Sequence, residues 1–225
     1  MIDCIIHKTK GQSVIDDVRS AAGKGVYMLI KPVYRLMSVL TVCIVCMVSI
    51  SSHAQEQARP EHRAEPIELP GVPNLHKVDS GLYRSAQPDE IGMINLRKMG
   101  IRTIVNLRAF HSDSDEIGDI KLACKNIPVN TWDIKEDDAV EFLKIVTETE
   151  NLPVLVHCQH GADRTGAMIA VYRIAVQGWS KREAIQEMTR GGFGFHEIWI
   201  NLPSWIESLD IDEIREKAGI SPVKR

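Results

Sequence analysis

The chain has 225 residues, of which 44% are hydrophobic, and it carries a formal net charge of −3 at pH 7. This length can bury the core of one globular domain and leave residues over for a terminal segment. The mildly acidic balance argues against a nucleic-acid partner, because affinity for phosphate backbones comes from clustered Lys and Arg. We expect the protein to act as a monomer.

The N-terminal segment has the features of an export signal. An uncharged apolar run over residues 36–50 follows basic residues and precedes small residues that fit a cleavage after Ala54. This pattern predicts a signal peptide over residues 1–54 and a periplasmic or secreted protein. The run is shorter than the ~20 residues that span a bilayer, so a retained membrane anchor with an exported catalytic domain is the alternative. Residues 1–27 are polar for a leader, and Met28 is an alternative start.

The mature chain is predicted to begin with a tether and a hairpin. Residues 55–73 are rich in Glu, Arg, Gln and Pro and are interpreted as a flexible linker. The folded domain is expected to cover residues 74–225. Its first feature is a turn at residues 79–81 between two short extended segments at 75–78 and 82–84, which predicts an N-terminal hairpin.

Strands and helices are then expected to alternate along the chain. Apolar runs predict strands at residues 103–107, 127–131 and 153–156. Helical periodicity predicts helices at residues 88–99, 115–125, 138–150, 164–176 and 198–209, and a capping box predicts a further helix that begins at Ser180. This alternation indicates an α/β fold with a mostly parallel central sheet of about four to five strands, flanked by helices on both faces.

The segment that carries chemistry reads VLVHCQHGADRTG and ends at Gly166. An apolar strand is followed by a glycine-containing loop and the start of a helix. Such a loop can aim several backbone N–H groups at one point, and the helix N-terminus adds its own unpaired donors. The segment therefore predicts a cradle for an anion of the size of phosphate.

Within this cradle Cys158 is the expected nucleophile, because a site that stabilises anions also favours a thiolate. Arg164 is expected to bind two phosphate oxygens with its planar guanidinium. Thr165 can donate its hydroxyl to the sulfur, and Gly161 permits a backbone angle that a side chain would oppose. The residues expected to surround the phosphate are Gln159, His160, Gly161, Ala162, Asp163 and Thr165.

The stretch HCQHGADRTG resembles the signature loop of dual-specificity and tyrosine phosphatases. The segments LYRSAQP, VNLR and YRI, with the later GGFG, extend the resemblance to small bacterial periplasmic phosphatases of the TpbA type over residues 74–205. The resemblance implies a protein-tyrosine-phosphatase-like fold, a phosphocysteine intermediate and no cofactor. It also implies a phosphorylated protein substrate, with activity on phosphotyrosine and some activity on phosphoserine or phosphothreonine.

A phosphatase of this kind needs an acid that protonates the leaving group, and three aspartates compete for the role. Asp137 and Asp138 lie at an expected helix start, where a carboxylate normally binds backbone N–H groups and stays ionised. Asp133 lies earlier in the loop, between Trp132 and Ile134, whose apolar bulk favours the neutral acid. We therefore predict that Asp133 is the general acid.

Other polar residues are expected to support the loop. His157 precedes the nucleophile and should orient it through hydrogen bonds. Asn106 and Arg108 end a central strand, where α/β sheets bind ligands. They either brace the loop, or Arg108 pairs with acidic residues between 113 and 116. Residues 83–85 are interpreted as a strand-to-helix junction. No pair of His, Cys or Asp has metal-ligand spacing, so we expect no metal.

Two other function classes stay open. One is hydrolysis of inositol phosphates or other small phosphorylated metabolites, although the loop lacks the lysines that would favour a polyanion. The other is an inactive phosphate-binding module. The presence of both the expected nucleophile, Cys158, and the expected phosphate-binding arginine, Arg164, argues against it. Cys124 is the other cysteine that follows the predicted leader. A disulfide between Cys124 and Cys158 is not expected, because the nucleophile must be free.

Overall fold

The computed structural model of the protein describes residues 63–221. The predicted leader, over residues 1–54, lies outside this range. Among the described residues no helix is both long enough and apolar enough to cross a membrane.

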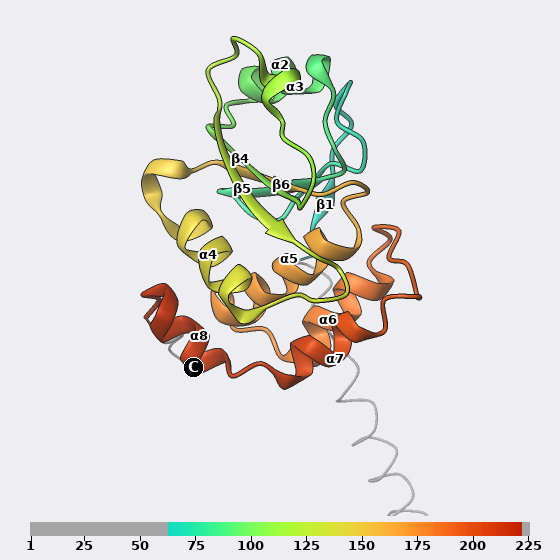
Figure 1. Cartoon of the computed structure of the whole chain (residues 1–225), viewed down its shortest axis with the longest axis vertical. Coiled ribbons are helices and arrows are strands. Elements are labelled where there is room, and N and C mark those ends of the chain that lie inside the picture. The colour runs from blue at the N-terminus through green and yellow to red at the C-terminus, as the bar shows by residue number, and fades with distance from the viewer. Residues whose placement is uncertain (1–62, 222–225) are drawn as a thin grey trace, which may run out of the picture. The chain divides into compact units, whose positions relative to one another are not determined.

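A mixed sheet forms the centre of the domain (Figure 1). Its strands lie in the order β1-β2-β3-β6-β4-β5. Their bounds are β1 Glu65–Pro66, β2 His76–Lys77, β3 Leu82–Ser85, β4 Thr103–Arg108, β5 Ala123–Val129 and β6 Val154–His157. The β3, β6, β4 and β5 strands pair in parallel, whereas β1, β2 and β3 pair antiparallel. The predicted α/β fold, its parallel core and its N-terminal hairpin are therefore confirmed.

The strand register brings three chain segments together at one edge of the sheet. His157, the last residue of β6, lies opposite Ser85 of β3 on one side and Asn106 of β4 on the other. Because these strands are parallel, the loops that follow them leave the sheet at the same edge. This edge is where the phosphatase-like loop begins.

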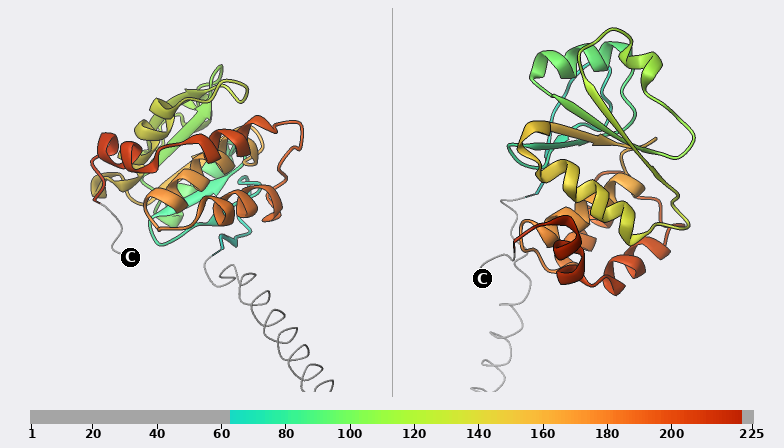
Figure 2. Two further views of the ribbon diagram at one scale, coloured as in Figure 1. Left: turned by 90° about the horizontal axis from the view of Figure 1, so that it is seen from below. Right: turned by 60° about the vertical axis from the view of Figure 1, so that its left-hand side comes forward.

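Helices cover both faces of the sheet (Figures 1 and 2). The two on one face are α2 Glu90–Met99 and α3 Ser114–Ile117. Those on the other face are α4 Glu136–Thr147, α5 Asp163–Ala175, α6 Lys181–Arg190, α7 Asn201–Ser208 and α8 Ile211–Ala218. Gly100 ends α2 with φ 99°, a left-handed conformation that favours glycine.

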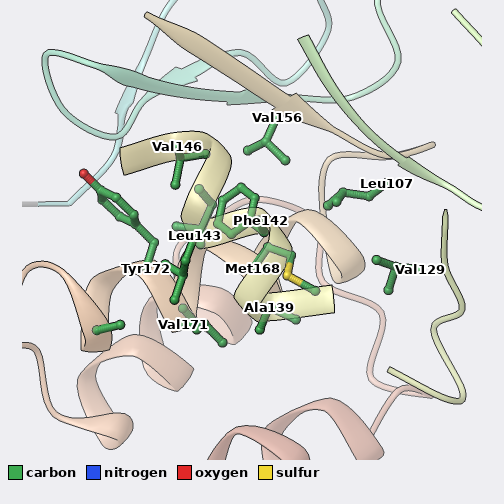
Figure 3. Close-up of a cluster of buried hydrophobic side chains, with 14 of the residues drawn as sticks. Leu107, Val129, Ala139, Phe142, Leu143, Val146, Val156, Met168, Val171 and Tyr172 are labelled. Carbon is green, nitrogen blue, oxygen red and sulfur yellow. The ribbon is translucent and has the colours of Figure 1, made fainter. Parts of the chain in front are cut away.

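Successive side chains of the central strands point to opposite faces of the sheet, and they form one hydrophobic core on each face. On β4, Ile104 packs with the cluster under α2, whereas Val105 belongs to the larger cluster under α4 and α5. Figure 3 shows Phe142 of α4 beside Met168 of α5, below Val156 of β6. The α5 helix is buried along almost its whole length. This packing fixes the position of its N-terminus, which follows the loop after β6.

The structure corrects three expectations. The fold begins before residue 74, because β1 pairs with β2 and Val72 is buried, so residues 63–73 are not a loose linker. Most of the helix expected at 115–125 is absent, since only α3 forms before β5 begins. β5 is an edge strand with an exposed first half, and its polar pattern therefore resembles a surface helix. The sequence also missed α8, which Asp210 caps by accepting from two backbone N–H groups.

Candidate active site

The loop predicted to cradle an anion joins the end of β6 to the start of α5. Cys158 follows β6 directly and is 2% exposed, and α5 begins at Asp163. Gly161 has φ 68°, and a side chain there would overlap the backbone of Ser85. The loop is therefore pressed against the end of β3, and its path depends on the absence of a side chain at this glycine.

Arg84 of β3 lies under this loop and is a site residue that the sequence analysis missed. Its guanidinium is fully buried, donates from Nη2 to the carbonyl of Gly161 at 2.7 Å, and lies 3.7 Å from the ring centre of Phe193. Burial lowers the pKa of Arg84 to about 10, although the negative charge of Glu187 raises it in part. A cation with a pKa of about 10 is still charged at neutral pH, so Arg84 places a positive charge near the nucleophile.

The side chain of His157 is hydrogen-bonded to a buried aspartate, Asp113. Its Nε2 lies 2.8 Å from Asp113 Oδ2, and both side chains are fully buried. Gln87 and Asn106 each donate to Asp113 Oδ1 at 3.0 Å. Burial alone would raise the pKa of Asp113, but the hydrogen bonds that it accepts from His157 and Gln87 help to outweigh this effect, and the pKa is lowered. Asp113 is thus an ionised acceptor, so His157 Nε2 carries the hydrogen.

The same contacts decide between the two roles left open for the β4 residues. Asn106 donates to Asp113 and accepts from the backbone N–H of Arg108 at 2.8 Å. Arg108 donates from Nη1 to Gln87 Oε1 at 3.1 Å. Both residues therefore brace the network behind the loop, with Gln87 between Arg108 and Asp113.

A pocket of about 420 Å³ opens beside the loop. The residues that line it are Arg108, Ala109, Phe110, Thr131, Gln159, His160, Asp163, Arg164, His196, Ile198 and Trp199. Arg108 and Arg164 are its two guanidinium groups. Phe110 and Ile198 contribute apolar surface to it, and 91% and 78% of their own surfaces are exposed. The lining of the pocket thus combines two cations with exposed apolar side chains.

Two cradle residues differ from expectation. Asp163 turns toward the segment after α6, where its carboxylate accepts from the backbone N–H of His196 at 2.9 Å and from His196 Nδ1 at 2.8 Å. Thr165 Oγ1 is buried without a hydrogen-bond partner among residues 63–221, so the expected donation to Cys158 is not formed. Gln159 and His160 are exposed, whereas Ala162 is buried.

Comparison with known proteins identifies the family. The model of a dual-specificity protein-tyrosine phosphatase (DSP-PTPase) domain fused to NAD+ kinase matches residues 72–199. The chain belongs to the dual-specificity phosphatase family. The dual specificity protein phosphatase TpbA of Pseudomonas aeruginosa strain UCBPP-PA14 is 32% identical over 72% of this chain and 75% of its own length. The crystal structure of P. aeruginosa TpbA superposes with a TM-score of 0.65 and 29% identity, over 72% of this chain and 99% of that one.

A further relative is named as a phosphatase of an inositol compound. The inositol diphosphatase DSP3 of Arabidopsis thaliana is 24% identical over 69% of this chain and 78% of its own length. The stronger similarity to TpbA shows that the chain is a cysteine-based protein phosphatase of the TpbA type. The predicted family, enzyme class and fold are confirmed.

Asp133, the predicted general acid, is not among the residues that line the pocket. The side chain of Asp133 is 61% exposed and lies 3.7 Å from Lys135 Nζ, and Trp132 is exposed beside it. The apolar enclosure expected around Asp133 is therefore absent. Asp138 binds the backbone N–H of Lys135, as predicted, but burial raises its pKa despite that bond. The bond lowers the pKa of Asp138, as expected, but the effect of burial is larger.

Proposed function

We propose that this phosphatase hydrolyses phosphotyrosine in exported or cell-surface proteins through a phosphocysteine intermediate. The observation that carries the proposal is the pocket, whose lining brings the Arg164 guanidinium of the Cys158 loop together with exposed apolar side chains. A phosphate dianion matches the guanidinium, and an aromatic leaving group matches Phe110 and Ile198. The export-signal pattern of the N-terminal segment supports the cellular location.

The proposed reaction has two displacements at phosphorus. The Cys158 thiolate attacks in line, the P–S bond forms and the bond from phosphorus to the tyrosine oxygen breaks. Arg164 holds two equatorial oxygens, and the buried charge of Arg84 stabilises the thiolate when it attacks and when it leaves again. Water then cleaves the P–S bond, and inorganic phosphate departs.

We further propose that Asp133 protonates the departing phenolate and afterwards accepts a proton from the attacking water. The loop that carries it is close to the pocket, because Thr131 lines the pocket and lies two residues earlier. Asp133 can reach the leaving group only after a movement of this loop. Catalytic loops commonly close in this way when substrate binds.

Inositol phosphates are the rival substrate class, since a relative of this chain is named for them. Their several phosphates require several cations, but the pocket offers two guanidinium groups and is also lined by the carboxylate of Asp163. The distinguishing experiment compares kcat/KM of the full chain on a phosphotyrosine peptide and on an inositol pyrophosphate. A clear preference for the inositol compound would refute the proposal.

Arg164→Lys is the variant that tests the cradle. Lysine keeps the charge but cannot make the paired hydrogen bonds of a guanidinium, so we expect a large loss of kcat on the phosphotyrosine peptide. Arg102→Lys, at an exposed residue just before β4, is the matched control. Equal kcat in the two variants would contradict the assignment of Arg164.

A further inference from the structure

Two imidazoles and a carboxylate come together in the lining of the pocket. His160 belongs to the Cys158 loop, Asp163 begins α5, and His196 lies in the segment after α6. Each offers a ligand atom within 4.8 Å of the others. The rings of His160 and His196 have centres 5.2 Å apart and are tilted by 60°. The sequence showed no metal-ligand spacing, because His196 joins the other two only through the packing of its segment against the start of α5.

The spacing of the two imidazoles fits a shared zinc ion. Two imidazoles that share one tetrahedral ion at Zn–N distances of about 2.0–2.1 Å have ring centres roughly 5 Å apart. Two ligands of one tetrahedral ion lie about 3.3 Å apart. Asp163 Oδ2 and His196 Nδ1, now 2.8 Å apart in a hydrogen bond, would therefore have to separate by about half an ångström to share the ion. Three protein ligands would leave the fourth position of the ion open.

The carboxylate is preorganised, whereas the imidazoles can adjust. Asp163 has a side chain only 10% exposed, and its other oxygen is held by the backbone N–H of His196. His160 is exposed, and the side chain of His196 is 47% exposed. A fixed anion with two movable neutral ligands suits a borderline cation such as Zn²⁺ better than Mg²⁺ or Ca²⁺, which prefer oxygen ligands.

We propose that His160, Asp163 and His196 bind a Zn²⁺ ion that inhibits the phosphatase. The ion would replace the proton that His196 Nδ1 shares with Asp163. All three residues line the pocket that also contains Arg164, so the ion would occupy the path of the substrate. The inhibition rests on the proposed phosphatase activity, whereas binding of the ion does not.

Two rival zinc ligands must be separated in the test. One is the Cys158 thiolate. The other is a second group of potential ligands, formed by His111, Asp113 and Glu116. The full chain carrying Cys158→Ser removes the thiolate and keeps both histidine groups. In this background His196→Asn and His160→Asn test the proposed site, and His111→Asn is the matched control.

Zinc binding is measured by titration calorimetry, and the ligand set is read from the absorption spectrum of bound Co²⁺. We expect one ion per chain in the Cys158→Ser protein, with affinity at least tenfold weaker after His196→Asn or His160→Asn and unchanged after His111→Asn. Thermal unfolding checks that the variants are folded. Absence of zinc binding, or its loss only with His111→Asn, would overturn the site.

Inhibition is measured separately with Cys158 intact. Zinc should inhibit hydrolysis of the phosphotyrosine peptide, and the concentration for half inhibition should rise at least tenfold in His196→Asn. If zinc binds the Cys158→Ser protein but His196→Asn is inhibited like the wild type, the inhibitory role is wrong. If no substrate is hydrolysed at all, the proposed function fails, while the calorimetry still decides the site.

Discussion

Replacing Asp113 by Asn tests whether the hydrogen bond between Asp113 and His157 positions the Cys158 loop. Asp113→Asn keeps an oxygen for Gln87 and Asn106 but places an amide opposite His157 Nε2, 2.8 Å away in the native protein. The ionised carboxylate holds the hydrogen on Nε2, whereas the amide of asparagine would favour a hydrogen on Nδ1. The Nδ1 atom is buried and has no hydrogen-bond partner among residues 63–221. The substitution should therefore disturb His157, the residue directly before the nucleophile.

The size of the effect follows from the contact that is lost. A hydrogen bond to a charged group contributes about 1.5–3 kcal/mol, so the free energy of unfolding should fall by about this amount at neutral pH. If the same interaction positions the loop in the transition state, kcat should fall ~10–150-fold, with KM changed much less.

The pH dependence provides a second signature. The pKa of Asp113 is lowered in the folded protein, so its contribution to stability is fully present above the ordinary Asp value of about 3.9. The contribution is lost as pH falls through the lower, folded value. The difference in unfolding free energy between the wild type and Asp113→Asn should therefore shrink in acid.

Denaturant unfolding at several pH values and steady-state kinetics of the full chain check these expectations. Asp115→Asn is the matched control, because Asp115 lies two residues away on α3 and is exposed. The reasoning is refuted if Asp113→Asn matches Asp115→Asn in stability and in kcat, or if its stability difference does not depend on pH.

Three further substitutions test the chemistry. Cys158→Ser should abolish turnover of a phosphotyrosine peptide yet still bind vanadate, and turnover near the wild-type level would exclude a covalent intermediate. Arg84→Gln should slow alkylation of Cys158 by iodoacetamide roughly tenfold in mildly acidic buffer, because a buried cation near the thiolate is lost. Mass spectrometry separates this signal from Cys124, whose pKa is raised to about 11 by partial burial of the thiol and by the nearby Asp113 carboxylate. An unchanged rate would contradict the role of Arg84. Asp133→Asn should lower kcat about 10²–10⁴-fold on phosphotyrosine but less on an activated nitrophenyl ester. If Asp138→Asn shows that pattern instead, the acid lies at the start of α4.

Local order along the chain explains why so much of the site could be read from the sequence. The predicted site residues Cys158, Gly161 and Arg164 follow one another in a single strand–loop–helix segment. Each of these elements is specified by its own residues. Cys158 and Gly161 accordingly occupy the positions expected of them. The parallel core of the sheet could also be predicted, because apolar strands alternate with amphipathic helices.

The predictions failed where a residue depends on partners that are distant in the chain. Arg84 is separated from Gly161 by 77 positions, and Asp113 from His157 by 44. These pairs meet because β3, β6 and β4 are parallel neighbours whose carboxyl ends share one edge. The sequence shows each polar residue but not the register that brings it to a partner.

The sequence by itself therefore determined the enzyme family, and it predicted the nucleophile and the phosphate-binding loop, since these depend on contiguous residues. The tertiary structure alone decided which residues surround that loop. It placed Arg84 beneath the loop, Asp113 behind His157, and His196 beside Asp163 in the lining of the pocket. The physical reason is that strand pairing and helix packing act across the chain, whereas hydrophobic patterns and turn signals report only on neighbours.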